Sequence, residues 1–208
     1  MTAALTRFAP LAFISLFFAV GFGWRSWLQY RRYGHTGVIL FQQQGLWPKL
    51  RDAALLVLPA GLLALTLGQA LAPGSVAAGR LSGLESGPAA LAGAALLAAS
   101  LWFMVAAQLQ MGKSWRIGIE DDARPGLVTW GLYRFCRNPI FAAMLVALVG
   151  LVLLLPSWLT LAILAATYAG IRRQVTEEES YLQRSYAHEY SAYAGSVGRF
   201  TPWIGRLR

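Results

Sequence analysis

The chain has 208 residues, of which 57% are hydrophobic and 13% are charged. This charged fraction is about half that of an average soluble domain, and the charges cluster between four neutral stretches, 8–24, 53–79, 86–112 and 138–171. Charge-free helices of such length would have no face for water, so the composition excludes an ordinary soluble domain. It predicts an all-α integral membrane protein, folded as a single membrane domain over residues 1–208.

The formal charge of +9 is also typical of nucleic-acid-binding proteins. Here the lysines and arginines flank apolar stretches, where anionic membrane lipids attract them, so we expect membrane lipids and no nucleic acid as partners. Cys136 is the only cysteine, which excludes an intrachain disulfide. The two histidines, His35 and His188, belong to no cluster with metal-ligand spacing, and we predict no metal site.

Three neutral stretches predict one membrane span each, because about 20 apolar residues cross the hydrocarbon core. These spans are residues 8–28, a segment within 53–72, and residues 89–109. Arg25 follows the first apolar run between Trp24 and Trp27 and is expected to anchor that helix at the interface.

The fourth neutral stretch is too long for one span, since its 34 residues would reach about 51 Å as a single helix. Pro156-Ser157-Trp158 lies at its centre and predicts a tight turn. We therefore expect a helical hairpin with short arms at residues 140–155 and 158–171. A separate amphipathic helix is expected to follow it on the cytoplasmic side.

The distribution of basic residues predicts the orientation. Lysine and arginine number one in the N-terminal tail, five in the first loop, one in the second, five in the third, none in the hairpin turn and six in the C-terminal tail. With five spans, every basic-rich segment falls on one side, which the positive-inside rule makes cytoplasmic. The N-terminus is then outside and the C-terminus in the cytoplasm.

Two polar segments on the expected cytoplasmic side precede the hairpin. Gly112-Lys-Ser-Trp-Arg-Ile-Gly118 is either an interfacial Trp/Arg belt or the roof of a binding pocket. Gly131-Leu-Tyr-Arg-Phe-Cys-Arg-Asn-Pro139 leads into the hairpin, with Asn138 placed as an N-cap and Pro139 in the first turn. Between these segments, Glu120-Asp121-Asp122 is expected to form an exposed acidic loop.

The segment after the hairpin carries an unusual carboxylate. Glu178, Leu182 and Tyr186 recur at helical spacing and predict an amphipathic helix. Arg173 and Glu177 form an i,i+4 pair on that helix. Glu178 instead lies on the Leu/Tyr face, where a carboxylate is costly unless it is paired or functional.

An ordered series of motifs resembles the isoprenylcysteine carboxyl methyltransferases and their bacterial relatives. It consists of Gly131-Leu-Tyr133 with Arg137-Asn138-Pro139, then Arg173 with Glu178-Glu179-Ser-Tyr-Leu182, then Tyr186-Ala-His-Glu-Tyr190 with Tyr193, and finally Val197-Gly-Arg199-Phe with Pro202. The motifs span roughly residues 110–203. The resemblance implies transfer of a methyl group from S-adenosylmethionine to a lipophilic acceptor that enters from the bilayer, in what we expect to be a bacterial inner membrane. The acceptor group is left open among the carboxylate of a prenyl-cysteine-like compound, a thiol and a lipid amine.

Carried over to this sequence, the resemblance implies particular site residues. Arg173 and Glu178 are expected nearest the methyl transfer, as catalytic residues. The cofactor pocket is expected to be lined by Tyr133, Arg137, Asn138, Pro139, Glu178, Glu179 and Tyr190. Asn138 replaces the histidine usual in this family, and an amide forms hydrogen bonds but does not titrate. Two other classes remain open, a membrane reductase using a nicotinamide cofactor and a non-enzymatic lipid-binding protein.

Overall fold

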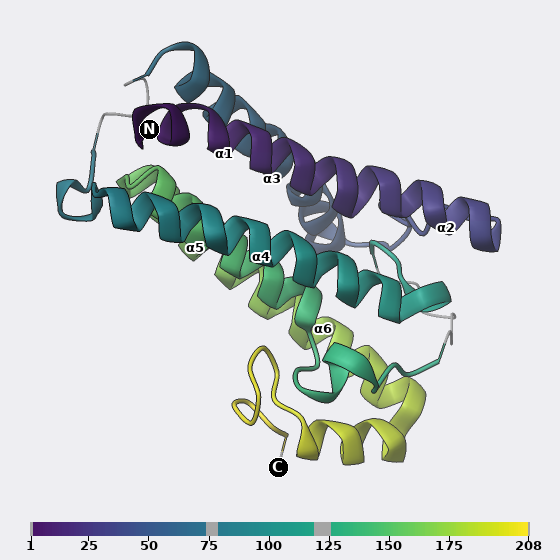
Figure 1. Cartoon of the computed structure of the whole chain (residues 1–208). Coiled ribbons are helices and arrows are strands. Elements are labelled where there is room, and N and C mark those ends of the chain that lie inside the picture. Colours follow the sequence, from purple (N-terminus) through teal and green to yellow (C-terminus); the bar gives the residue numbers. More distant parts are fainter. Residues whose placement is uncertain (1, 74–78, 119–125, 208) are drawn as a thin grey trace.

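The computed structural model describes residues 2–73, 79–118 and 126–207, and these residues form an all-helical bundle without a regular strand (Figure 1). Glu120-Asp121-Asp122 lies outside the described residues. The main helices, in chain order, are α1 (Thr2–Phe18), the π-helix η1 (Ala19–Trp24), α2 (Arg25–Tyr33), α3 (Leu46–Leu71), α4 (Gly87–Met111), α5 (Pro139–Leu154) and α6 (Trp158–Ser196). Short 3-10 turns are η2 (Ser82–Leu84), η3 (Gly112–Ser114) and η4 (Gly131–Arg134).

Within the described ranges, three helical segments are long and apolar enough to cross a membrane: Ala3–Tyr33, Leu46–Leu71 and Gly87–Ser114. They contain the first three predicted spans and extend beyond them. The first is a continuous helical rod because η1 joins α1 to α2. The prediction of an all-α integral membrane protein is confirmed.

The hairpin is present, but its second arm does not end where the sequence analysis placed it. α5 is a short apolar helix that ends one residue before the predicted boundary. α6 starts as predicted and then continues through the segment expected as a separate helix, bending at Ala187, where φ is 30° and ψ is −101°. The helix continues because residues 171–186 contain neither proline nor glycine, so nothing interrupts it where its composition changes from apolar to charged, and the bend at Ala187 comes later.

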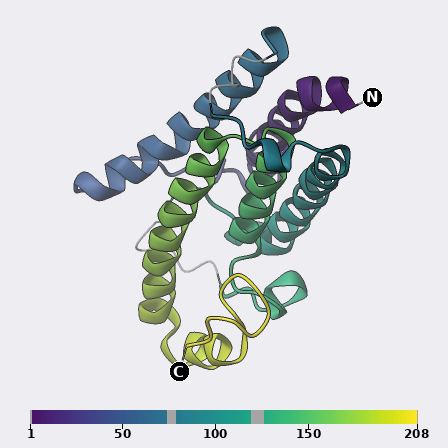
Figure 2. The same ribbon diagram turned by 90° about the vertical axis from the view of Figure 1, so that its left-hand side faces the viewer.

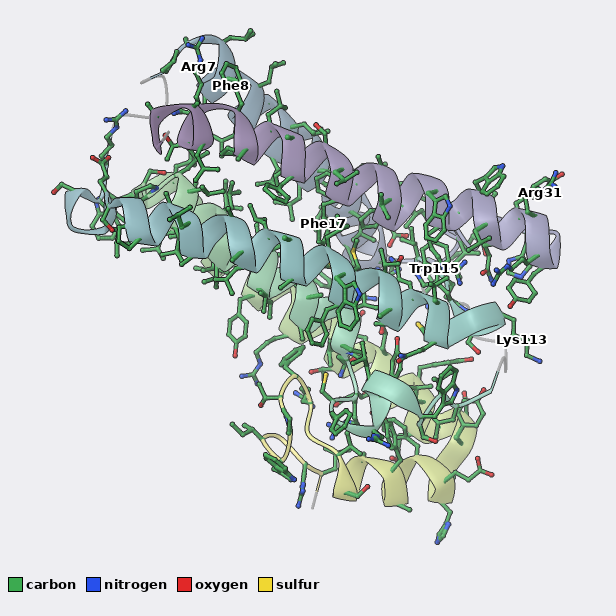
Figure 3. All side chains as sticks on the ribbon, viewed as in Figure 1. Arg7, Phe8, Phe17, Arg31, Lys113 and Trp115 are labelled. Carbon is green, nitrogen blue, oxygen red and sulfur yellow. The ribbon has the colours of Figure 1, made fainter. Side chains whose placement is uncertain are left out.

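α4 and α5 form the most extensive helix pair in the bundle. Their backbones meet at Gly93 and Gly150: a Cβ added to either glycine would lie 2.7 Å from the carbonyl oxygen of the other. Small residues permit such close approach between membrane helices. Phe17 of α1, labelled in Figure 3, belongs to the same buried cluster as Leu97 of α4 and Ala147 of α5.

Backbone pairing between loops shows which connections share an end of the bundle. At one end, Leu81 N donates to Pro156 O and Trp158 N to Gly79 O, both over 3.0 Å, so the second loop lies beside the hairpin turn. At the other end, Ile117 N donates to Gly37 O over 2.8 Å, which joins the third loop to the first. This is the grouping that the charge count requires.

Arg25 is buried, and the prediction that it is an interfacial anchor is wrong. Its guanidinium donates to Gln29 Oε1 over 2.7 Å and to Gly112 O over 2.8 Å, and it stacks 4.5 Å from the ring centre of Trp115. Gln29 reaches the Trp115 carbonyl over 3.3 Å. Figure 3 shows Trp115 between α2 and the end of α4. The first span thereby holds the loop that follows α4.

Candidate functional site

A cavity of about 170 Å³ lies where the end of α4, the start of α5 and the outer half of α6 meet. Its walls come from three segments. The end of α4 and the loop after it contribute Met111, Ser114, Arg116, Gly118 and residues 126–128. The segment that leads into α5, residues 131–141 and called here the α5 approach, contributes Tyr133 and residues 137–141. α6 contributes Glu178, Tyr181, Leu182, Tyr186, Tyr190 and Tyr193. The Gly112–Gly118 segment therefore forms part of the cavity wall, as its second interpretation proposed.

Glu178 faces this cavity as a half-buried carboxyl group. Burial raises its pKa to about 7, and repulsion from Glu179 and Glu177 adds to the rise. A hydrogen bond of 2.6 Å from Gln174 Nε2 and the positive charge of Arg51 act in the opposite direction. A carboxyl group balanced near neutrality can bind a cation when ionised and can accept a proton at ordinary pH.

Tyr190 places an unpartnered hydroxyl in the same cavity wall. The residue is only 1% exposed, and its hydroxyl has no hydrogen-bond partner within normal geometry among the described residues. Arg137 lies nearby, but its N–H groups point to other acceptors. Burial raises the pKa of Tyr190, which keeps the phenol protonated. A buried hydroxyl without a partner is costly in a folded protein and fits a place where a ligand supplies the missing bond.

Arg137 lines the cavity, but its guanidinium donates all of its hydrogen bonds to other groups of the protein. Nε and Nη2 donate to Glu179 Oε1 over 3.0 and 2.9 Å, Nη1 donates to the carbonyls of Ala194 and Val197, and Nη2 also donates to Gly205 O over 3.1 Å. These bonds use all five N–H donors of an arginine. The structure thus places Arg137 as the residue that ties the C-terminal segment to the α5 approach, and a direct hydrogen bond to a cofactor has no donor left.

Glu179 and Asn138 complete the same buried cluster. Glu179 accepts from Arg137, from Arg199 Nη2 over 2.6 Å and from Asn138 Nδ2 over 3.3 Å, and it is not among the residues that line the cavity. Asn138 is the N-cap residue of α5, with Pro139 following at the first helical position, but its side chain does not cap the helix. The amide instead donates to Glu179 and to Arg199 O, a task that needs no titratable ring.

Arg173 lies apart from the cavity. Its side chain is 58% exposed, stacks 3.6 Å from the ring centre of Trp47 and lies 3.6 Å from Glu177. It is five residues from Glu178 on an unbroken helix, a separation of about 140° around the axis. The structure therefore does not bring the two predicted catalytic residues together.

Arg51 is a charge near the site that the sequence analysis counted only as a loop cation. It is buried, donates to Asp52 Oδ1 over 2.7 Å and approaches Glu177 Oε2 to 3.7 Å. Asp52 also accepts from Phe41 N over 2.6 Å, which fixes the first loop against α3. The adjacent opposite charges at the start of an apolar run were a signal for such a buried pair.

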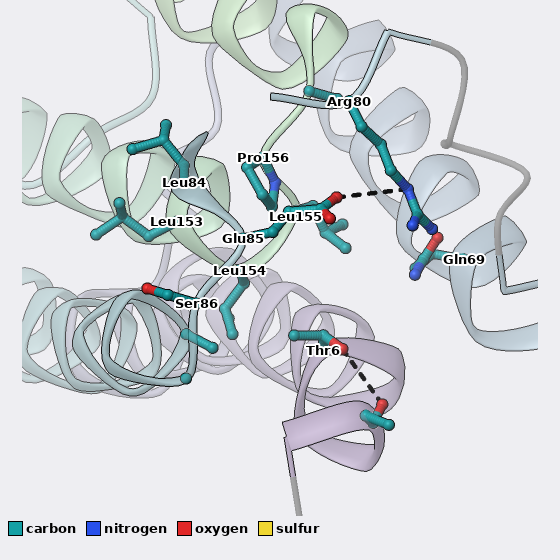
Figure 4. Close-up of a pocket in the computed structure, with 14 residues that line it drawn as sticks. Thr6, Gln69, Arg80, Leu84, Glu85, Ser86, Leu153, Leu154, Leu155 and Pro156 are labelled. Carbon is teal, nitrogen blue, oxygen red and sulfur yellow. Dashed lines mark hydrogen bonds and ion pairs between the residues drawn. The ribbon is translucent and has the colours of Figure 1, made fainter. Parts of the chain in front are cut away.

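A larger cavity, of about 330 Å³, lies at the opposite end of the bundle (Figure 4). Its charged residues are Arg80 and Glu85, which pair with each other at 3.6 Å and are both well exposed. Thr6 turns its hydroxyl to Ala3 O over 3.3 Å. None of the motif residues lines it, so the smaller cavity is the stronger candidate site despite its size.

Comparison with known proteins identifies the family of this region. Residues 88–189 match the model of the phospholipid methyltransferase family, which is part of the isoprenylcysteine carboxyl methyltransferase superfamily. The chain belongs to this superfamily of membrane methyltransferases. The match runs from the start of α4 into α6 and includes Glu178, Glu179 and the α5 approach, while Tyr190 and the closing motif lie beyond it. No curated protein and no solved structure matches the chain.

The family match favours a methyltransferase over the other two classes of function considered. Nothing in the comparisons favours a nicotinamide-dependent reductase or a lipid-binding protein without activity. Among the described residues, no group of three or more histidine, cysteine, aspartate or glutamate side chains is arranged to hold a metal ion.

Proposed function

We propose that this membrane methyltransferase binds S-adenosylmethionine in the cavity between the α5 approach and α6, and methylates a lipophilic acceptor that enters from the bilayer. The observation that carries the proposal is the pairing, in one cavity wall, of the Glu178 carboxyl group with the unpartnered Tyr190 hydroxyl. S-adenosylmethionine supplies an electrophilic methyl group on a sulfonium. Both groups suit that ligand, since a carboxylate attracts a cationic centre and a phenol donates to a polar one.

The apolar part of the wall supports an acceptor from the lipid phase. Ile140, Phe141 and Leu182 line the cavity where α5 begins its membrane span. An acceptor atom held there in line with the methyl group forms a bond to the methyl carbon as the methyl–sulfur bond breaks, and positioning supplies most of such a barrier reduction. At about 170 Å³ the cavity is below the roughly 300–1,000 Å³ of pockets for ligands of this size, so binding has to move its walls apart.

We further propose a lipid amine as the acceptor, ahead of a carboxylate or a thiol. The matched family is described by phospholipid methylation, and Glu178 adds a chemical reason. An amine attacks only after losing its proton, and a carboxylate whose conjugate acid has a pKa near 7 accepts that proton better than an ordinary glutamate does.

Isothermal titration of the detergent-purified full chain with S-adenosylmethionine, which carries the sulfonium charge, tests the cofactor assignment. Glu178→Gln and Tyr190→Phe each remove one polar contact and are expected to weaken binding, by roughly tenfold for a lost charge-assisted bond. Glu189→Gln is the matched control, because Glu189 is an exposed glutamate on the same helix. Failure of the folded wild-type chain to bind overturns the proposal. Equal affinities of the Glu178→Gln and Glu189→Gln variants overturn the site.

A further inference from the structure

The C-terminal segment, residues 197–207, forms a compact loop that turns back from the end of α6 toward the start of α5 (Figures 1 and 2). Arg137 N donates to Gly198 O over 2.9 Å, and the Arg137 guanidinium holds the carbonyls of Val197 and Gly205. The loop is thus tied to the residue two positions before an apolar membrane helix. Its depth relative to the bundle is set by these bonds.

The tip of this loop exposes two large apolar side chains. Trp203 is 75% exposed and Ile204 is 72% exposed. Trp203 also has a φ of 67°, in the left-handed region that bulky L residues rarely adopt. A hydrogen bond of 2.9 Å from Ile204 N to Pro202 O closes a three-residue turn centred on Trp203, and a bond of 2.8 Å from Arg199 N to Ile204 O closes the wider loop. This strained backbone conformation exposes the indole of Trp203 and adds no packing within the described fold. Strained residues of this kind concentrate at functional sites, such as sites that bind a ligand.

Cations accompany these apolar side chains. Arg206 follows them in the loop. Arg134 is two residues before Cys136, whose backbone pairs with Gly198 of the loop. Its exposed guanidinium lies 4.6 Å from the ring centre of the half-exposed Phe135. The carboxylate of the adjoining cluster, Glu179, is buried and bonded to Arg199. Tryptophan with neighbouring arginine, at the level where a membrane helix begins, is the combination found at the interface of a bilayer with anionic headgroups.

We propose that loop 197–207 is a second membrane attachment, which inserts Trp203 and Ile204 into the headgroup region of an anionic leaflet while Arg134 and Arg206 bind lipid phosphates. α6 leaves the bundle beyond its apolar half, and the loop returns its far end to the membrane surface. Through Arg137 and Glu179 the attachment also holds the cavity wall against the bilayer. The proposal is independent of the reaction that the cavity supports.

Spin labelling of the full chain in lipid bilayers tests it. A nitroxide is attached at Ile204→Cys, with Glu189→Cys as the solvent-exposed control. The native Cys136 is buried, which shields its thiol from the label, and the wild-type chain treated in the same way measures any background labelling. In bilayers containing phosphatidylglycerol, the ratio of oxygen to nickel-chelate accessibility is expected to be several-fold higher at 204 than at 189. Combined Arg134→Gln and Arg206→Gln substitutions are expected to lower it to the value in phosphatidylcholine alone.

Other outcomes overturn the proposal in distinct ways. Equal ratios at 204 and 189 place the loop in water. Dipolar broadening between labels at 204 shows that a second copy of the chain covers the tip. A high accessibility ratio that depends neither on phosphatidylglycerol nor on the two arginines shows that the loop inserts without binding anionic lipid, which contradicts the proposed role of Arg134 and Arg206.

Discussion

Replacing Glu178 by glutamine is expected to stabilise the ligand-free protein at alkaline pH and to leave its stability unchanged at acid pH. The pKa of Glu178 is raised to about 7 in the folded chain, above its ordinary value of 4.5. The folded state therefore keeps its proton while the unfolded chain has already lost it. Between these two pH values the wild-type protein loses stability as pH rises, and above about pH 7 the loss is complete.

The size of the effect follows from the same pKa difference. A fully buried carboxyl group would lose about 3 kcal/mol, at about 1.4 kcal/mol for each tenfold change in proton affinity. Glu178 is only half-buried and faces an open cavity, so solvent screening reduces this to about 1 kcal/mol. For a chain of this length, that corresponds to a rise in Tm of about 2–4 °C. Glutamine keeps the oxygen that accepts the hydrogen bond from Gln174.

Thermal unfolding in detergent, followed by tryptophan fluorescence at pH 5 and pH 8, measures the effect. The Tm difference between Glu178→Gln and wild type is expected to appear at pH 8 and to be small at pH 5. Glu189→Gln should give no difference at either pH. If Glu178→Gln lowers Tm at pH 8, Glu178 is a stabilising ionised group, and the reasoning that assigns it to ligand binding at the expense of stability is refuted.

Two further substitutions test the frame around the cavity. Arg137→Lys removes the guanidinium that donates to the carbonyls of Val197 and Gly205. The C-terminal loop should then open more often, and a thiol-reactive dye should label the adjacent Cys136 at least about tenfold faster. Arg184→Lys, on the exposed face of α6, is the control and should not change the labelling rate. Gly93→Ala places a Cβ 2.7 Å from Gly150 O and should cost about 1–3 kcal/mol by the fall in Tm. Gly61→Ala, with nothing within 4 Å of the added carbon, should leave Tm unchanged or slightly higher.

Much of the bundle could be predicted because lipid imposes simple constraints on sequence. Long apolar stretches located the three long helices, and the 34-residue neutral stretch had to turn at Pro156. The grouping of loops at two ends followed from counting cations. Periodicity also placed Glu178, Leu182 and Tyr186 on one face, which the structure turns toward the cavity.

The features that could not be predicted depend on where individual hydrogen bonds go. A buried Arg25 and an anchoring Arg25 have the same local sequence, and only the Gly112 and Gln29 acceptors decide between them. Arg137 reads as a ligand-binding cation until its five donors are traced. The continuity of α6 was missed for a different reason, because hydropathy marks where a helix leaves the membrane and not where it ends.

Glu178 and Glu179 show how far a motif can mislead when its members are treated alike. Consecutive residues on a helix point about 100° apart, so one carboxylate faces the cavity and the other faces Arg137 and Arg199. The ionised side chains therefore have opposite effects on the stability of the fold. Burial makes ionised Glu178 costly and available to a ligand, whereas two arginines compensate the charge of Glu179. Removing Glu179 would leave the buried Arg137 and the partly buried Arg199 without their carboxylate. Loss of binding without loss of folding is expected at the first position, and loss of folding at the second.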